Sequence, residues 1–401
     1  MKRMYETALG RVTYVFIGLA AVAVMSGCDR DGEEMNVNGL NSDLLVLSAA
    51  KTTVAPTLDG TVGLGEWDEA EAIYVSTEVP DIESFPGYAG RGYQVRLKAM
   101  YDDQNVYFLV QYDDPGLNLD RQTWYFDPDD QEWRQESGRP LFDDSGVQTR
   151  QAFYEDKFSF MFQANQVDGF DSNGCWVACH TGLAPTSNDG GKTDLKYTND
   201  GGQVLDMWHW KSVRGTAMET CDDQYTDSQR SAQNGGRHSD AGTNAYVNNV
   251  TTINGFNVPK FLIPNPSVPY YWVVTDGSDP VPQAEGTALA VVDVADDGSL
   301  TLSDATVIDP NVDGGFGRDE SKRPPSIYVR PPSGDRADIN AVAMFSKGWT
   351  VEFKRSLVTG SSVDVQFGDL GAAYPFGVAV FDNAQIAHAV SDLPVLLTFR
   401  R

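Results

Sequence analysis

Two cysteines and a histidine lie close together near the middle of the chain, in the segment Cys175-Trp176-Val177-Ala178-Cys179-His180. Two thiols can add to the vinyl groups of a haem, and a histidine directly after the second thiol can bind the iron. The familiar attachment motif is Cys-x-x-Cys-His, whereas three residues separate the thiols here. A local disulfide or half of a zinc site are the alternatives, although the sequence has no second cysteine pair to complete a zinc site. The spacing predicts one covalent haem c whose iron is bound by His180.

The iron of such a haem has a second axial position, and residues 206–211 (Asp-Met-Trp-His-Trp-Lys) contain candidate ligands for it. Side chains alternate along an extended segment, so the three candidates Met207, His209 and Lys211 would share one face, opposite to Trp208 and Trp210. We expect His209 to be the distal ligand, and the alternative is a hydrogen-bonded core histidine between packing tryptophans. Trp176, Trp208 and Trp210 are expected to shield the macrocycle from water, which would raise its reduction potential.

The start of the chain indicates export. Basic residues are followed by an apolar run over residues 12–25, which is short for a membrane span, and then by Met25-Ser26-Gly27-Cys28. This pattern is typical of a bacterial lipoprotein, so residues 1–27 are predicted to be a signal peptide and Cys28 to carry lipid. An ordinary secretory signal with an incidental Cys28 is the alternative. The mature protein is expected in the periplasm or on the outer cell surface, tethered to a membrane, where c-type haem is attached.

The composition narrows the range of partners. The formal net charge of −27 repels nucleic acid and anionic lipid, and it favours a basic partner protein. We therefore expect redox partner proteins and no nucleic acid. With 41% hydrophobic and 11% aromatic residues, the chain has enough apolar side chains for a sizeable core.

Short alternating segments separated by Gly, Pro and Asp turns fill most of the chain after residue 54. Residues 95–112 have the pattern of a hairpin, residues 157–162 place three phenylalanines on one face, and four further strands are expected between residues 349 and 399. Long helical periodicity is missing almost everywhere. The sequence predicts a flexible tether over residues 28–53 and an antiparallel β-sandwich over residues 54–401.

Residues from about 165 to 255 differ from the strand-rich ends, because they are rich in Gly, Asn, Asp and Ser. They also contain the cysteine pair and three of the four histidines, so we expect a long loop-rich insertion that carries the haem site. Two Asp-rich segments elsewhere, at residues 127–130 and 295–298, lack a full calcium-loop pattern and are expected to form turns. Cys221 is the one remaining cysteine, expected to be a small buried residue.

Several segments carry a family resemblance, and they are distributed over roughly residues 55 to 400: Leu58-Asp59-Gly60, Gly65-Glu66-Trp67-Asp68-Glu69-Ala70, and residues 95–115, 206–211, 348–349, 353–357 and 374–383. In their order and spacing they resemble the haem-binding domain shared by the gamma subunit of ethylbenzene dehydrogenase, dimethyl sulfoxide reductase-like enzymes and certain c-type cytochromes. The resemblance implies a β-sandwich that holds one haem and passes single electrons. In the gamma subunits the haem is noncovalent and bound by Met and Lys, so the resemblance adds Lys260 as an alternative distal ligand. Cys175, Cys179 and His180 depart from that pattern and make this chain similar to the covalent branch.

These observations predict an exported c-type cytochrome that transfers electrons through one covalent haem and is not itself an enzyme. One alternative is a haem-bearing, non-catalytic subunit of a molybdenum oxidoreductase complex. Another is a carbohydrate-binding β-sandwich lipoprotein without a redox role, because the opening segment is also similar to carbohydrate-binding modules of the same fold. The cysteine-histidine run separates these hypotheses, since a glycan-binding protein has no need for it.

Overall fold

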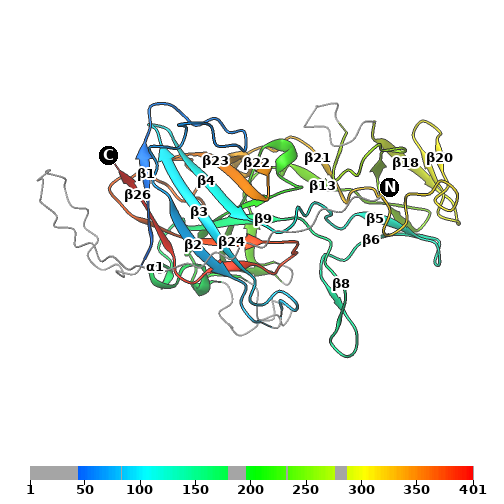
Figure 1. The fold of residues 1–401 in the computed structure, drawn as a ribbon, viewed down its shortest axis with the longest axis horizontal. Helices are drawn as coiled ribbons and strands as arrows, with labels where there is room; N and C mark the ends of the chain where they lie inside the picture. Colours follow the sequence, from blue (N-terminus) through cyan, green and yellow to red (C-terminus); the bar gives the residue numbers. More distant parts are fainter. Residues whose placement is uncertain (1–43, 83, 179–195, 232–233, 276–286, 401) are drawn as a thin grey trace, which may run out of the picture. The chain divides into compact units, whose positions relative to one another are not determined.

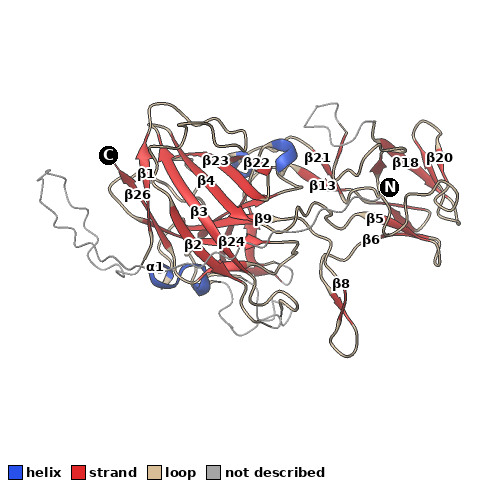
Figure 2. Cartoon of the chain, viewed as in Figure 1, coloured by secondary structure: helices blue, strands red, loops and turns tan. Residues whose placement is uncertain are grey.

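A computed structural model describes residues 44–82, 84–178, 196–231, 234–275 and 287–400. Nearly all regular structure in these residues is strand, so the predicted all-β class is confirmed (Figure 2). The described helices are short: α1 (Phe170–Asn173), η1 (Gly174–Val177), η3 (Thr216–Met218) and η4 (Asp335–Ala337). Within the described ranges, no helix has the length and apolar character needed to cross a membrane.

The main sheet has 13 strands and folds into two layers around one core (Figure 1). The first, called the β10 layer, consists of β12 (Gly235–Ser239), β11 (Asp222–Ser231), β10 (Leu205–Lys211), β9 (Lys157–Gln163) and β24 (Tyr374–Phe381). The second, called the β3 layer, consists of β2 (Ile73–Glu78), β3 (Gly92–Tyr101), β4 (Asn105–Asp113), β23 (Gly348–Ser356) and β22 (Asn340–Phe345). β25 (Ala389–Ser391) connects the layers, and β1 (Val46–Lys51) pairs in parallel with both β26 (Val395–Arg400) and β3. The prediction of a flexible tether over residues 28–53 is therefore wrong for residues 46–51, because Leu47 and Ala49 are buried in the sandwich core.

The core forms because alternate side chains of both layers are aromatic or aliphatic. Phe160 of β9 and Trp208 of β10 meet Phe108 of β4, with ring centroids 5.1 and 5.6 Å apart from that of Phe108. The predicted alternation along β10 is confirmed, because Trp208 and Trp210 are fully buried in this core. We call the side of the β10 layer that faces the core its inner side, and the opposite side its outer side.

A second apolar core lies within the same residues 54–401, which the sequence did not distinguish from the sandwich core. It is built from Trp124, Trp133, Leu262, Leu300 and other side chains of short strands. These strands and the remaining small sheets are β5 (Trp124–Asp127) with β6 (Glu132–Gln135), β7 (Leu141–Phe142) with β8 (Gln148–Arg150), β13 (Tyr246–Asn248) with β21 (Ile327–Val329) and β17 (Val273–Val274), β14 (Thr251–Ile253) with β15 (Phe256–Val258), and β16 (Phe261–Leu262) with β18 (Leu289–Val294), β19 (Leu300–Leu302) and β20 (Val307–Ile308).

The region expected as a loop-rich insertion is only partly loop. β10, β11 and β12 lie inside residues 165–255 and belong to the main sheet, because the alternating aromatic residues of β10 bury well against β9. The two Asp-rich segments form turns as predicted: Asp127 accepts a hydrogen bond from the Asp129 amide at 3.2 Å, and Asp297 accepts one from the Ser299 amide at 3.0 Å. Cys221 is a fully buried core residue, also as predicted.

Candidate functional site

Cys175 lies against the outer side of the β10 layer. It belongs to η1 and packs with Met161 of β9, Met207 of β10 and Val390 of β25 in a small apolar cluster. Gly377 of β24 makes this approach possible, because a Cβ there would come within 3.3 Å of both Cβ and Sγ of Cys175. Trp176 is half-buried beside it, and its Nε1 donates a 3.2 Å hydrogen bond to the Ser391 carbonyl. Cys28, Cys179 and His180 lie outside the described residues.

His209 occupies the same outer side, two residues further along β10 than Met207, or about 7 Å at the usual rise of a strand. Its ring is buried and stacks on Phe381 of β24, with the centroids 5.3 Å apart. Nδ1 lies 3.4 Å from Oε1 of Gln224, whereas Nε2 has no hydrogen-bond partner among the described residues. A buried ring nitrogen without a partner costs free energy, so this atom is suited to a ligand that the protein itself does not supply.

The state of the His209 ring follows from its neighbours. Burial lowers its pKa well below the usual value, and the positive charges of Lys211 and Lys157 lower it further, so the ring is neutral at pH 7. The Gln224 amide donates to Asp222 at 2.9 Å and therefore presents its carbonyl oxygen, which can only accept, to Nδ1. The proton must then be on Nδ1, which leaves a lone pair on Nε2.

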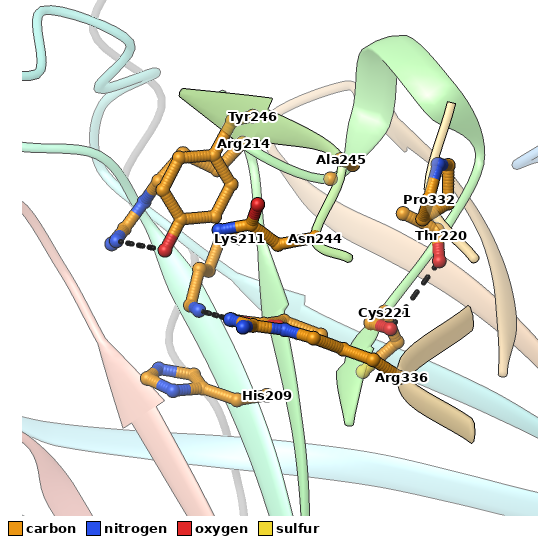
Figure 3. A pocket seen from close by; sticks show the side chains of 12 residues that line it. His209, Lys211, Arg214, Thr220, Cys221, Asn244, Ala245, Tyr246, Pro332 and Arg336 are labelled. Atoms are coloured by element: carbon orange, nitrogen blue, oxygen red, sulfur yellow. Dashed lines mark hydrogen bonds and ion pairs between the residues drawn. The ribbon is translucent and has the colours of Figure 1, made fainter. Parts of the chain in front are cut away.

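Basic side chains lie around His209 in a narrow pocket (Figure 3). Lys211 and Arg336 both form ion pairs with Asp222, the Arg336 contact being 2.6 Å. Burial alone would raise the pKa of Asp222, but these two cations lower it to about 2. Because Asp222 is a single carboxylate shared by two cations, the pocket keeps surplus positive charge.

Residues next to the pocket also have more basic groups than carboxylates. Glu155 is fully buried and is shared by Arg214 at the pocket and by Arg121. Lys157 of β9 is also buried, and its side-chain nitrogen donates a 3.0 Å hydrogen bond to the backbone carbonyl of Gln385. Burial and the positive charge of Arg214 lower the pKa of Lys157 well below its usual value, so Lys211 and the arginines carry the positive charge here. In a chain with a net charge of −27, a local surplus of buried positive charge favours an anionic group at this place.

The other predicted site residues lie elsewhere. Trp208 and Trp210 point to the inner side, where Trp210 packs on Trp349 at 4.9 Å, so they do not share a face with Cys175. Lys260 is exposed between β15 and β16, with its ammonium group 5.3 Å from the Phe261 ring centroid and 5.6 Å from that of Tyr328. The structure thus brings His209 to the side where Cys175 lies, and it does not bring Lys260 there.

Sequence reasoning missed the residues that set the properties of His209. Gln224 and Asp222 lie beside it on the neighbouring strand β11, Phe381 contacts it from β24 beyond β9, and Arg336 reaches the pocket from η4. Alternation along residues 206–211 already placed Lys211 on the same face as His209. No local pattern identifies Arg336, because it is more than a hundred residues away in the sequence.

Fold and site together define a β-sandwich protein with a buried, cation-rich face. The chain belongs to the ethylbenzene dehydrogenase family, whose model matches residues 66–392. A comparison with curated proteins finds no match. Among solved structures, the chain is similar to a carbohydrate binding module of family 9 from Caldicellulosiruptor kristjanssonii in complex with cellotriose, at 9% identity and a TM-score of 0.28, covering 88% of this chain and 93% of that one. The same module in complex with glucose gives 10% identity and a TM-score of 0.27, with 89% and 95% covered.

Proposed function

We propose that this protein is an exported electron carrier that holds one haem c on the outer side of the β10 layer. Cys175 and Cys179 would form the thioethers, His180 would be the proximal ligand and His209 the distal one. The observation that carries the proposal is the buried, neutral His209 ring, whose Nε2 has no described partner on the side where Cys175 lies. When bound, haem supplies an iron that takes up and releases single electrons.

Among the candidates for the distal ligand, His209 fits best. The Lys211 ammonium group is paired with Asp222 and offers no lone pair, and Lys260 is exposed beside Phe261 and Tyr328. Gln224 orients the His209 ring by accepting from Nδ1, as second-sphere groups do for metal-bound histidines. Phe381 restricts the ring by stacking on it.

The surplus positive charge supports the same proposal. A porphyrin of this kind has two propionate carboxylates, and Lys211, Arg214 and Arg336 are basic groups beside His209 that could neutralise them. Of the three tryptophans, Trp176 is on the proper side to exclude water from the macrocycle. Trp208 and Trp210 fill the core behind β10, so we assign them the role of holding that strand in place.

The location and partners belong to the proposal as well. Lipid on Cys28 would tether the protein to a membrane after export, and its acidic surface would favour redox partner proteins with basic docking sites. The family match also supports a related arrangement, in which the chain is a non-catalytic, haem-bearing subunit of a molybdenum oxidoreductase. Identifying the chains that co-purify with the native protein distinguishes a free carrier from a subunit.

Peroxidase staining of a denaturing gel tests the proposal, using protein matured with haem-attachment machinery. We expect a haem-linked band that is lost in Cys175→Ala/Cys179→Ala and retained in the matched control Cys221→Ala, since Cys221 is buried in the core. A wild-type chain that is folded but has no stained band would reject the proposal. For the distal ligand, we expect His209→Ala to change the visible and near-infrared spectra and Lys260→Ala to leave them unchanged.

Glycan binding is the second candidate function, and a surface depression favours it. On the outer face of the β3 layer, an open depression with an empty volume of about 710 Å³ is lined by Tyr74, Gln94, Arg96, Gln111 and Thr350. Tyr74 is 61% exposed, and such a ring beside amide and hydroxyl groups can stack on a sugar. Calorimetric titration with cellotriose, using Tyr74→Ala as the control, tests it: heat that the variant abolishes supports this function, and no heat at millimolar sugar rejects it.

A further inference from the structure

Five aspartates from five separate segments converge at one edge of the sandwich core, and we call them the aspartate cluster. Asp206 comes from β10, Asp223 from β11, Asp240 follows β12, Asp338 precedes β22 and Asp364 lies between β23 and β24. One carboxylate oxygen from each of Asp223, Asp338 and Asp364 lies within 4.8 Å of the others. Asp240 faces Asp364 closely, and Asp338 faces Asp223.

The cluster has far less positive charge than negative charge. Among the described residues, its one salt bridge joins Arg355 of β23 to Asp206, with Nη1 2.7 Å from Oδ2. The Arg355 guanidinium also donates to the Val365 carbonyl, and its single positive charge acts on Asp223, Asp338 and Asp364 as well as on Asp206. Like charges this close and this deeply buried repel one another strongly unless a cation or protons neutralise them.

Carboxylate oxygens in the cluster also lack hydrogen-bond donors. No amide, hydroxyl or basic group of the described residues donates to Asp206 Oδ1, Asp223 Oδ2, Asp364 Oδ1, Asp338 Oδ1 or either oxygen of Asp240. The pairs Asp240–Asp364 and Asp338–Asp223 can hydrogen-bond only if the two carboxyls of each pair share a proton. Asp206 and Asp223 are 0% exposed, Asp364 is 2% exposed and Asp240 is 4% exposed. Unpartnered oxygens on side chains this deeply buried point to a ligand that the chain does not provide.

A second group of aspartates shows that most buried carboxylate oxygens elsewhere in the fold do receive hydrogen bonds. Asp114, Asp156 and Asp382 also place oxygens within 4.8 Å of one another. There, however, both oxygens of Asp156 accept hydrogen bonds, from the amides of Asn118 and Asn383 and from the Trp349 indole, at 2.9 to 3.2 Å. Both oxygens of Asp382 accept as well, from Tyr93 and Asn118. In this second group Asp114 Oδ2 alone lacks a donor among the described residues, whereas six oxygens of the aspartate cluster lack one although Asp206 Oδ2, Asp223 Oδ1 and Asp364 Oδ2 do accept hydrogen bonds.

We propose that the aspartate cluster binds a divalent cation, and that the cation is Ca²⁺. The available ligands are carboxylate oxygens that come from five segments of the chain. Ca²⁺ accepts six to eight oxygen ligands in variable geometry, whereas Mg²⁺ requires a nearly ideal octahedron and usually keeps several waters, so this set of ligands suits Ca²⁺ better. The ion would hold β10 and β11 to the segments beside β22 and β23, across the edge of the core, independently of any haem.

Thermal unfolding of the full-length protein tests the proposal, after dialysis against EDTA and addition of CaCl₂ or MgCl₂ alone. At Ca²⁺ concentrations about a hundred times the dissociation constant, we expect the wild-type Tm to rise by about 5 °C, and less with Mg²⁺. Asp223→Asn should abolish the rise, and in EDTA its Tm should equal or exceed that of the wild type, because the substitution removes one repelling charge. The matched control Asp114→Asn, which alters the second group, should keep the full response.

Elemental analysis of protein purified without chelator provides a measurement that does not depend on any variant. About one calcium per chain is expected in the wild type. A wild-type Tm that neither cation changes, together with no bound calcium, overturns the proposal. An Asp223→Asn variant that responds to Ca²⁺ as the wild type does would overturn it too. If that variant does not fold, the wild-type titration and the calcium content still decide.

Discussion

The two sides of the paired strands β10 and β11 carry opposite net charges, although consecutive residues of the same strands line them. On the outer side, Asp222 is shared by Lys211 and Arg336 next to the neutral His209 ring, so positive charge is in surplus. On the inner side, Asp223 belongs to a cluster of carboxylates whose described salt bridge involves Arg355 alone. Alternation along a strand thus lets adjacent residues prepare two sites for ligands of opposite charge. Each side is incomplete without the ligand that we propose for it.

The largest expected effect comes from removing Arg355, the cation that pairs with Asp206 on the inner side. Arg355→Met should lower the free energy of unfolding by about 3–5 kcal/mol in EDTA, because it leaves Asp206 buried without its partner. Urea unfolding followed by circular dichroism measures this. The matched change on the outer side, Arg336→Met, should cost clearly less, since Asp222 keeps Lys211. Equal losses for the two variants would break the comparison.

The pH dependence of stability should have opposite signs on the two sides. Burial and the neighbouring Asp364 raise the pKa of Asp240 from 3.8 to about 8, so the native state holds this proton more tightly than the unfolded chain does. In EDTA, the inner side should therefore lose stability as the pH rises from about 4 to about 8. Burial lowers the pKa of His209 below its usual 6.5, so the outer side should lose stability as the pH falls below about 6.5.

Two substitutions separate these contributions in thermal unfolding of haem-free protein between pH 5 and pH 8. Asp240→Asn should reduce the loss of stability at high pH, and His209→Gln should reduce the loss at low pH. If both variants keep the wild-type profile, the charge states that we assign to the two sides are wrong.

Much of the fold was predictable, because burial of alternating aromatic residues determines which way β9 and β10 face. Because side chains alternate along a strand, the sequence predicts both the β-sandwich class and the position of His209 on the side opposite to the tryptophans. The aspartate cluster was not predictable, since Asp206, Asp240 and Asp364 lie far apart in the sequence and are three among many acidic residues. The second core was missed for a similar reason. Its strands are only two to six residues long, so no window contains enough alternation to distinguish them from loops.

The smallest effect is expected at Lys260. Its side chain is exposed, and its ammonium group lies 5.3 Å from the ring centroid of Phe261 and 5.6 Å from that of Tyr328. Lys260→Ala should change the free energy of unfolding by no more than about 0.5 kcal/mol and should leave the absorption spectrum unchanged. A spectral change equal to that of His209→Ala would transfer the distal position to Lys260 and remove the ligand role from the outer side of β10.

Mass spectrometry of the peptide that contains residues 175–180 tests the central claim most directly, on protein isolated from a host that attaches haem. We expect this peptide to carry one haem, linked through the sulfurs of Cys175 and Cys179. A peptide without haem, in which those two sulfurs are joined in a disulfide, would contradict it.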